Sequence, residues 1–331
     1  MSKDYIARPT RKRAPSFRKE LKVLLVLAVF ICALEIVSRI LAPTLDYDRK
    51  HIHNFPEIAK KLQKNESIKP KVLFLGNSLV MHGLDLEFTQ NKFDKKDLLT
   101  TSKITPVGTA ITDWTYLFKR YFPAETEQPD VVIMGFVGHH ISDDYTLKIR
   151  RLGRHFVAQK NLPELWSTEL HDIHRCTQTS LAHYSSLMGD QPEHQLYILD
   201  FLIPHYKSGV RLNNDIVDAA NQRRAENNAE PSSSAPATPS FARIKRFSDM
   251  MKERGVELWF VPMPQPEHYS LPDGCEEFIK ECGIHFRDAR SIPTMGESDF
   301  SDGYHLGETG KVKFTTWIHS QLNQHLVESA Q

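Results

Sequence analysis

The sequence predicts an α/β fold, a three-layer sandwich around a central parallel sheet, preceded by a transmembrane helix. Short unbroken apolar runs, such as residues 71–75 and 131–137, are typical of strands that are buried on both faces. Segments of helical periodicity separate these runs, and parallel strands require such crossover connections. A longer apolar run at residues 23–42 lies near the N-terminus and predicts the transmembrane helix.

The elements of the sheet domain follow from local patterns. Strands are expected at 71–75, between 98 and 107, and at 131–137, 256–261 and 284–288, and helices at 113–121, 241–254 and 308–326. The last helix is expected to direct Val312, Trp317, Ile318 and Leu322 toward the core. Right-handed crossovers between such strands give a flavodoxin-like sandwich, in which sites form at the carboxyl ends of the strands.

The chain divides into segments of different character. We expect a basic cytoplasmic tail at 1–22, an anchor at 23–42, and a polar stalk with a short helix at 43–70. The α/β domain is expected at 71–328, with a helical insertion over about 140–220. Residues 225–240 are rich in Ser, Pro, Ala and Asn and predict a disordered loop, because this composition cannot bury a core.

The apolar run near the N-terminus is short for a spanning helix. Its unbroken part, residues 23–34, is shorter than the ~20 residues that cross a bilayer. A signal anchor, a cleaved signal peptide and an amphipathic or buried helix are the alternatives. The lack of a small-residue cleavage pattern and the spacing of Glu35 and Arg39, which suits an ion pair, favour an uncleaved single-pass anchor. The basic tail then places the domain outside the cytoplasm, at the plasma (inner) membrane and facing the periplasm or exterior.

Composition excludes some classes of protein. An apolar share of 40% and a mean hydropathy of −0.42 fit a globular protein rather than a polytopic membrane protein. The net charge of +1 indicates no nucleic-acid partner. Cys275 and Cys282 are near enough in sequence to form a disulfide, with reduced thiols as the alternative, and the absence of any C-x-x-C pair argues against a cysteine-rich zinc site.

Two short motifs carry the candidate chemistry. Gly76-Asn77-Ser78-Leu79 follows the first strand, so Ser78 is expected at the carboxyl edge of the sheet, either as a nucleophile or as a helix cap. Asp302-Gly303-Tyr304-His305 precedes the last helix, and its aspartate is spaced to fold back onto the imidazole, with a surface turn as the alternative. A serine hydroxyl becomes a nucleophile when a base takes its proton and a carboxylate orients that base.

Taken together, these motifs resemble the first and last blocks of the SGNH/GDSL hydrolases. The first block has Asn77 where aspartate is more usual, and the last continues through Leu306 to Gly310. The resemblance covers roughly residues 70–328 and implies an SGNH-like fold. It assigns the nucleophile to Ser78, the base to His305 and the orienting carboxylate to Asp302.

The middle blocks of that family fit less closely. Gly108 takes the place of the family glycine whose N–H joins that of Ser78 in the oxyanion hole. After the third strand, His139 stands where the family usually has asparagine, and we expect it to be the third donor, with His140 as the alternative.

No metal or cofactor is expected. The nearby group of His139, His140, Asp143 and Asp144 matches no common zinc spacing.

An outward-facing SGNH-like domain on an anchor resembles bacterial proteins that add or remove acetyl groups on exported polysaccharides. We therefore expect an acyl-ester hydrolase or O-acyltransferase that acts on acylated carbohydrate or another small ester, with exopolysaccharide export proteins as candidate partners. One alternative is a non-catalytic SGNH-derived module that binds glycan or helps to assemble an export complex. A weaker alternative is a metal-dependent phosphoesterase that uses His139 and His140.

Overall fold

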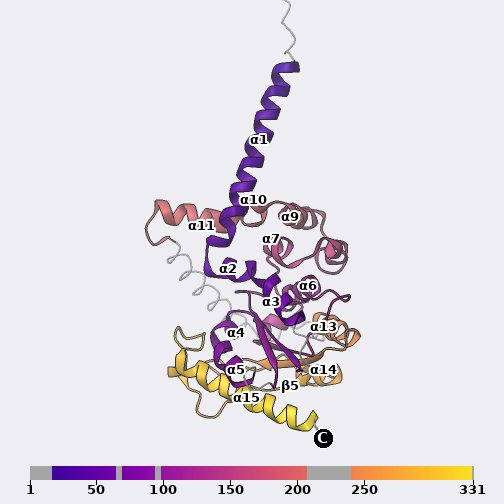
Figure 1. The fold of residues 1–331 in the computed structure, drawn as a ribbon, viewed down its shortest axis with the longest axis vertical. Helices are drawn as coiled ribbons and strands as arrows, with labels where there is room; N and C mark the ends of the chain where they lie inside the picture. The colour runs from indigo at the N-terminus through magenta and orange to yellow at the C-terminus, as the bar shows by residue number, and fades with distance from the viewer. Residues whose placement is uncertain (1–16, 65–68, 94–97, 207–239, 330–331) are drawn as a thin grey trace, which may run out of the picture.

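The computed structural model describes residues 17–64, 69–93, 98–206 and 240–329 (Figure 1). The loop expected at 225–240 therefore lies, up to residue 239, outside the described residues, as does most of the expected basic tail. A five-stranded sheet forms the centre of the molecule: β1 (Lys71–Leu75), β2 (Thr100–Ile104), β3 (Val131–Phe136), β4 (Glu257–Pro262) and β5 (His285–Phe286). All neighbouring strands are parallel and their order is 2-1-3-4-5, which confirms the predicted doubly wound α/β fold.

The central strands β1, β3 and β4 are largely apolar because helices cover both faces of the sheet. Leu73 and Leu75 belong to one core cluster, whereas Val72 and Phe74 belong to the other. The first face carries α3 (Phe55–Gln63), α6 (Ile111–Tyr121), α13 (Ala242–Glu253) and α14 (Cys275–Glu281). The second face carries α4 (Ser78–Gly83), α5 (Leu86–Phe93) and α15 (Glu308–Ser329).

The carboxyl ends of the first three strands lie level with one another. Leu75 pairs with Ile104 on one side and with Met134 on the other. The strand order reverses between β1 and β3, and ligands bind at such a switch point in open α/β sheets. The segments after β1, β2 and β3 therefore converge on one edge of the sheet.

The segment for which the sequence predicts a stalk is part of the folded body. It forms α2 (Tyr47–His53) and α3, and Phe55, Ala59 and Leu62 are at most 2% exposed. Their spacing of four and three residues gives α3 one apolar stripe, which packs into the core. The surrounding lysines hide that stripe when the segment is judged by composition alone.

The N-terminal helix α1 (Phe17–Leu41) extends away from the sheet domain (Figure 1). By length and composition it is apolar enough to cross a membrane, as a signal sequence or a single-pass anchor is. The C-terminal end of α1 lies beside α9 (Ile173–Tyr184), α10 (Ser186–Gly189) and α11 (Gln191–Leu202), which belong to the expected helical insertion. The insertion also contains α7 (Ile149–Arg151), η3 (Leu152–Phe156), α8 (Leu162–Leu165) and η5 (Trp166–Leu170).

The C-terminal helix corrects one expected core residue. Ile318 and Leu322 are buried, but Val312 is 59% exposed and Phe314 is buried in its place. Phe314, Ile318 and Leu322 repeat every four residues and form one stripe, and Val312 lies off that stripe.

The proposed disulfide is also wrong. Cys275 and Cys282 are both free thiols. Cys275 begins α14 and Cys282 follows its last residue, so their α-carbons are separated by roughly 10 Å of helix, whereas a disulfide needs less than about 7 Å. Burial raises the pKa of the Cys275 thiol to about 11.

Candidate active site

The structure brings the three candidate catalytic residues together. The Ser78 Oγ lies 2.9 Å from Nε2 of His305, and Nδ1 of the same ring lies 2.7 Å from Oδ2 of Asp302. Ser78 is nearly buried, whereas the Asp302 side chain is 55% exposed at the rim. A hydroxyl, an imidazole and a carboxylate thus form one continuous hydrogen-bonded chain across 227 residues of sequence.

The loop that carries His305 is built around Asp302. Its Oδ1 accepts hydrogen bonds from the backbone N–H groups of Tyr304 and His305, at 3.0 and 2.7 Å. Gly303, which lies between Asp302 and Tyr304, has a φ of +76°, a conformation that favours glycine. Burial alone would raise the pKa of the Asp302 carboxyl, but these bonds and the His305 ring hold it below its ordinary value of 3.8. Asp302 is therefore ionised at neutral pH, as an orienting carboxylate must be.

Two glycines let the helix of Ser78 pack directly on the sheet. A β-carbon added to Gly76 would lie 2.4 Å from Cγ2 of Val80, and one added to Gly135 would lie 2.2 Å from the same atom. Real β-carbons essentially never come within 3.0 Å of another heavy atom. Val80 of α4 therefore occupies the space that side chains on β1 and β3 would take, which sets the height of Ser78 above the sheet.

Asn77 joins the three segments that converge at this edge. Its Oδ1 accepts from the N–H of Leu79, and its Nδ2 donates to the carbonyl oxygen of Thr109 at 3.2 Å. The same Nδ2 lies 3.0 Å from Nε2 of His140, whose Nδ1 accepts from the N–H of Val137. The sequence motif contains Asn77 but does not reveal that it connects the turns after all three strands.

The two histidines after β3 have different environments. His140 is buried, and burial together with the nearby His139 and Lys148 lowers its pKa well below 6.5, so it stays neutral. His139 is exposed, and its ring centroid lies 4.0 Å from that of His140. The structure therefore places His140, rather than His139, in contact with the Asn77 turn.

The expected oxyanion donors are the backbone N–H groups of Ser78 and Gly108. In the part of the chain that the structure describes, neither N–H donates to a protein acceptor. Gly108 has φ of +60°, and an added β-carbon would approach Nζ of Lys148 to 2.9 Å, so a side chain is disfavoured here. Both N–H groups are thus available for a developing negative charge.

Two further side chains lie close to the site, one on α4 and one beside it. His82 stands one turn after Ser78, and its ring centroid lies 4.9 Å from that of His305. Lys103 of β2 donates to the carbonyl oxygens of Met81 and Leu84 at the end of the helix. Burial and the charge of Lys311 lower the pKa of Lys103 to about 8. Of these, only His82 has a sequence signal, its spacing of four residues from Ser78.

One of the two acidic residues considered for a metal site, Asp143, has other partners. Asp143 accepts hydrogen bonds from the N–H groups of Ala242 and Arg243 at the start of α13. Among the residues with described positions, no three histidine, cysteine or acidic side chains form a group that could hold a metal ion.

Comparison with known proteins gives structural matches alone. No protein-family model matches the chain, and no curated protein matches it in sequence. A protein of Bacteroides fragilis proposed to be an acylhydrolase matches with a TM-score of 0.39 and 12% identity, over 85% of this chain and 99% of that one. A variant of an acetyl-xylooligosaccharide esterase from Geobacillus matches with a TM-score of 0.35 and 9% identity, over 75% of this chain and 91% of that one. Scores and identities this low do not establish an activity.

Proposed function

We propose that the chain is a serine acyl-ester hydrolase or O-acyltransferase of the SGNH kind. The hydrogen-bonded chain from Asp302 through His305 to Ser78 supports this proposal. Such a chain lets the ring remove the hydroxyl proton while the carboxylate stabilises the imidazolium that forms.

In the first half of the reaction, Nε2 of His305 takes the proton from the Ser78 hydroxyl as Oγ attacks the acyl carbonyl carbon. The carbonyl oxygen becomes an oxyanion that accepts hydrogen bonds from the N–H groups of Ser78 and Gly108. When the tetrahedral intermediate collapses, the ester C–O bond breaks and His305 returns the proton to the leaving alcohol. The product is an acyl group on Ser78.

In the second half, His305 takes the proton from a hydroxyl compound as its oxygen attacks the acyl carbon; the bond between that carbon and Oγ of Ser78 then breaks, and His305 returns the proton to Oγ. Water as the attacking group gives hydrolysis, and a sugar hydroxyl gives transfer.

We further propose acylated carbohydrate as the substrate class and α1 as an uncleaved anchor. The exposed rim at Asp302 suits an ester carried on a large molecule better than an enclosed pocket would. Glu35 near the end of α1 accepts hydrogen bonds from the first residues of α10, and cleavage after the apolar run would remove this contact. An anchor with a basic N-terminal tail puts the domain outside the cytoplasm.

Covalent labelling tests the enzymatic proposal directly. A fluorophosphonate probe is expected to label the full chain at Ser78, and Ser78→Ala is expected to abolish labelling. Ser320→Ala, which changes an exposed serine of α15, is the matched control and should retain it. Equal labelling of Ser78→Ala and the parent, or no labelling of either, would instead favour a non-catalytic module.

A further inference from the structure

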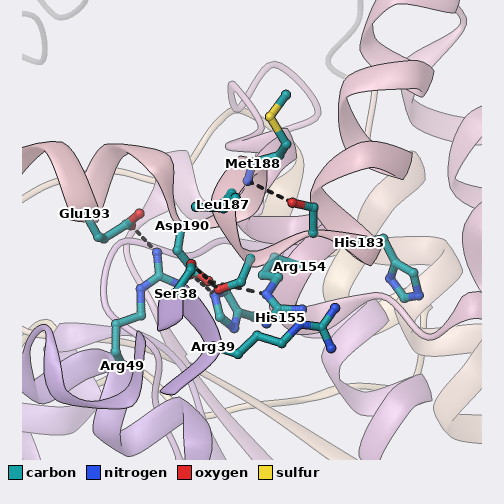
Figure 2. Close-up of polar contacts among 12 residues, drawn as sticks. Ser38, Arg39, Arg49, Arg154, His155, His183, Leu187, Met188, Asp190 and Glu193 are labelled. Atoms are coloured by element: carbon teal, nitrogen blue, oxygen red, sulfur yellow. Dashed lines mark hydrogen bonds and ion pairs between the residues drawn. The ribbon is translucent and has the colours of Figure 1, made fainter. Parts of the chain in front are cut away.

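The last turns of α1 are joined to α10 by polar contacts (Figure 2). The Glu35 carboxylate accepts from the Ser185 hydroxyl at 2.8 Å and from the N–H groups of Ser186 and Leu187 at 2.7 and 3.2 Å. Arg39 donates to the carbonyl oxygen of Tyr184 at 2.7 Å, so both ends of the segment from Tyr184 to Leu187 are hydrogen-bonded to α1. The position of α1 therefore determines the position of α10.

A buried ion-pair network attaches α10 and α11 to the rest of the domain (Figure 2). The side chain of Asp190 is fully buried and lies 3.3 Å from Arg49, 3.3 Å from Arg154 and 2.7 Å from His155. Arg49 also pairs with Glu193, which balances the two arginines with two carboxylates. Breaking a buried pair of this kind is costly, so α1, α10, α11 and the sheet domain move as one unit.

These helices expose most of the large apolar side chains that lie outside α1 and are exposed among the described residues. Outside α1, fourteen large hydrophobic side chains are exposed among the described residues, and nine of them lie between residues 173 and 203. They are Ile173, Leu181, Tyr184, Met188, Tyr197, Ile198, Phe201, Leu202 and Ile203, here called the α9–α11 surface. No residue of α11 is buried, and Phe201 is 82% exposed. A cluster of this size on one side of a protein indicates an interaction surface.

The length of α1 indicates what covers this surface. Exposed apolar side chains continue along α1 from Val23 to Leu41, a rise of about 27 Å that is close to the ~30 Å hydrocarbon core of a bilayer. The last ~9 Å of this rise, from Glu35 to Leu41, lies at the end of α1 that carries the α9–α11 surface, so this surface is level with the edge of the hydrocarbon core. Amphipathic helices that lie on a membrane bury their apolar side by about this depth, and tyrosine is enriched at that level.

We infer that the α9–α11 surface lies in the outer leaflet of the bilayer that α1 crosses. The domain is then in direct contact with the membrane and is not held away from it. This inference rests on the proposed anchor and is independent of the chemistry of Ser78. The contacts of Glu35 and Arg39 with α10 satisfy these charged groups at a depth where an unpaired charge would be expensive.

Tryptophan quenching tests the inference on the full chain. Phe201→Trp and Phe88→Trp are each reconstituted in phosphatidylcholine vesicles with plain or brominated acyl chains. The tryptophan fluorescence of the parent protein in the same vesicles is subtracted from that of each variant. Phe88 is the matched control because it is an exposed phenylalanine on α5, which lies at the far end of the molecule from α1. The brominated lipid is expected to reduce the Phe201→Trp signal by about two-fold and to leave that of Phe88→Trp unchanged.

Each outcome decides one question. Equal fluorescence of Phe201→Trp in both lipids would overturn the inference, and so would a blue-shifted emission without quenching, because that would mean a protein segment covers α11. Loss of α1 by cleavage would overturn the inference together with the anchor. Fluorophosphonate labelling in the same vesicles reports Ser78 separately, so quenching without labelling would reject the enzyme and retain the membrane contact.

Discussion

At the level of single residues, the triad geometry predicts unequal effects of three substitutions. Ser78→Ala and His305→Ala are expected to lower kcat by about 10³-fold or more, because each removes a group that forms or breaks a bond. Asp302→Asn is expected to be milder, because its rim position leaves the imidazolium in contact with solvent. Steady-state hydrolysis of a short-chain acyl ester measures all three, and near-parental turnover by Ser78→Ala would reject the nucleophile.

The histidines after β3 give a second prediction at this scale. If His139 is the third oxyanion donor, His139→Ala should lower kcat by about 10²-fold with an unchanged Tm, and His139→Asn should restore part of the rate. His140→Ala should lower Tm as well, because it empties a buried position beside Asn77.

Kinetics and thermal unfolding of the same variants separate these roles. Parental turnover by His139→Ala would leave a hole of two donors, Ser78 and Gly108.

The candidate catalytic residues could be proposed from the sequence, but their surroundings could not. The two end motifs single out Ser78 and His305, since each motif is local. The contact between Asn77 and His140 joins residues 63 apart and depends on how far β1 and β3 extend before they turn. No local pattern records that distance, so the alignment of His139 with the family asparagine could not be checked before the fold was known.

At the level of elements, the packing of α4 on the sheet predicts that a side chain at Gly135 would clash with Val80, and that shortening Val80 would relieve the clash. Gly135→Ala is expected to destabilise the fold by about 1–3 kcal/mol and to lower kcat/KM, because the new β-carbon overlaps Val80 and displaces Ser78. Val80→Ala removes the overlapping atom, so the double variant should recover both quantities relative to Gly135→Ala. Denaturant unfolding and ester hydrolysis measure the two effects, and additive losses in the double variant would contradict this account.

Which elements the sequence predicted depended on how visible their patterns are. Strands β1, β3 and β4 were found because each contains an unbroken apolar run, whereas β2 and β5 lack such a run and were placed only within the wider ranges 98–107 and 284–288. The helix α4 was expected only as a helix or turn that starts at Ser78, because its six residues are too few to show a period. The stalk was misinterpreted because residues 43–70 as a whole are rich in charged residues, and this composition hid the apolar stripe of α3.

At the level of the whole molecule, one buried carboxyl makes stability depend on pH. Burial raises the pKa of Asp113 to about 6 from its ordinary 3.8. Between these values the folded chain binds more protons than the unfolded chain, so this group's contribution to stability is present below pH 4 and is lost as pH rises through 6. The difference corresponds to about 3 kcal/mol.

Asp113→Asn removes this ionisation and keeps an oxygen for the hydrogen bond from the N–H of Ala110. Its Tm relative to the parent is therefore expected to increase between pH 4 and pH 7. Thermal unfolding at several pH values measures this difference, and a constant offset across the range would exclude Asp113 as its source.

The contact between Glu35 and Ser186 also has a consequence for the order in which the chain is made. These residues are 151 positions apart, so α1 leaves the ribosome well before α10 exists. In that interval Arg39, four residues away on the same helix, is the partner already at hand for the Glu35 carboxylate. The newly made α1 thus carries an internal ion pair that is later shared with the incoming α10, and α1 becomes the template on which the last part of the insertion assembles.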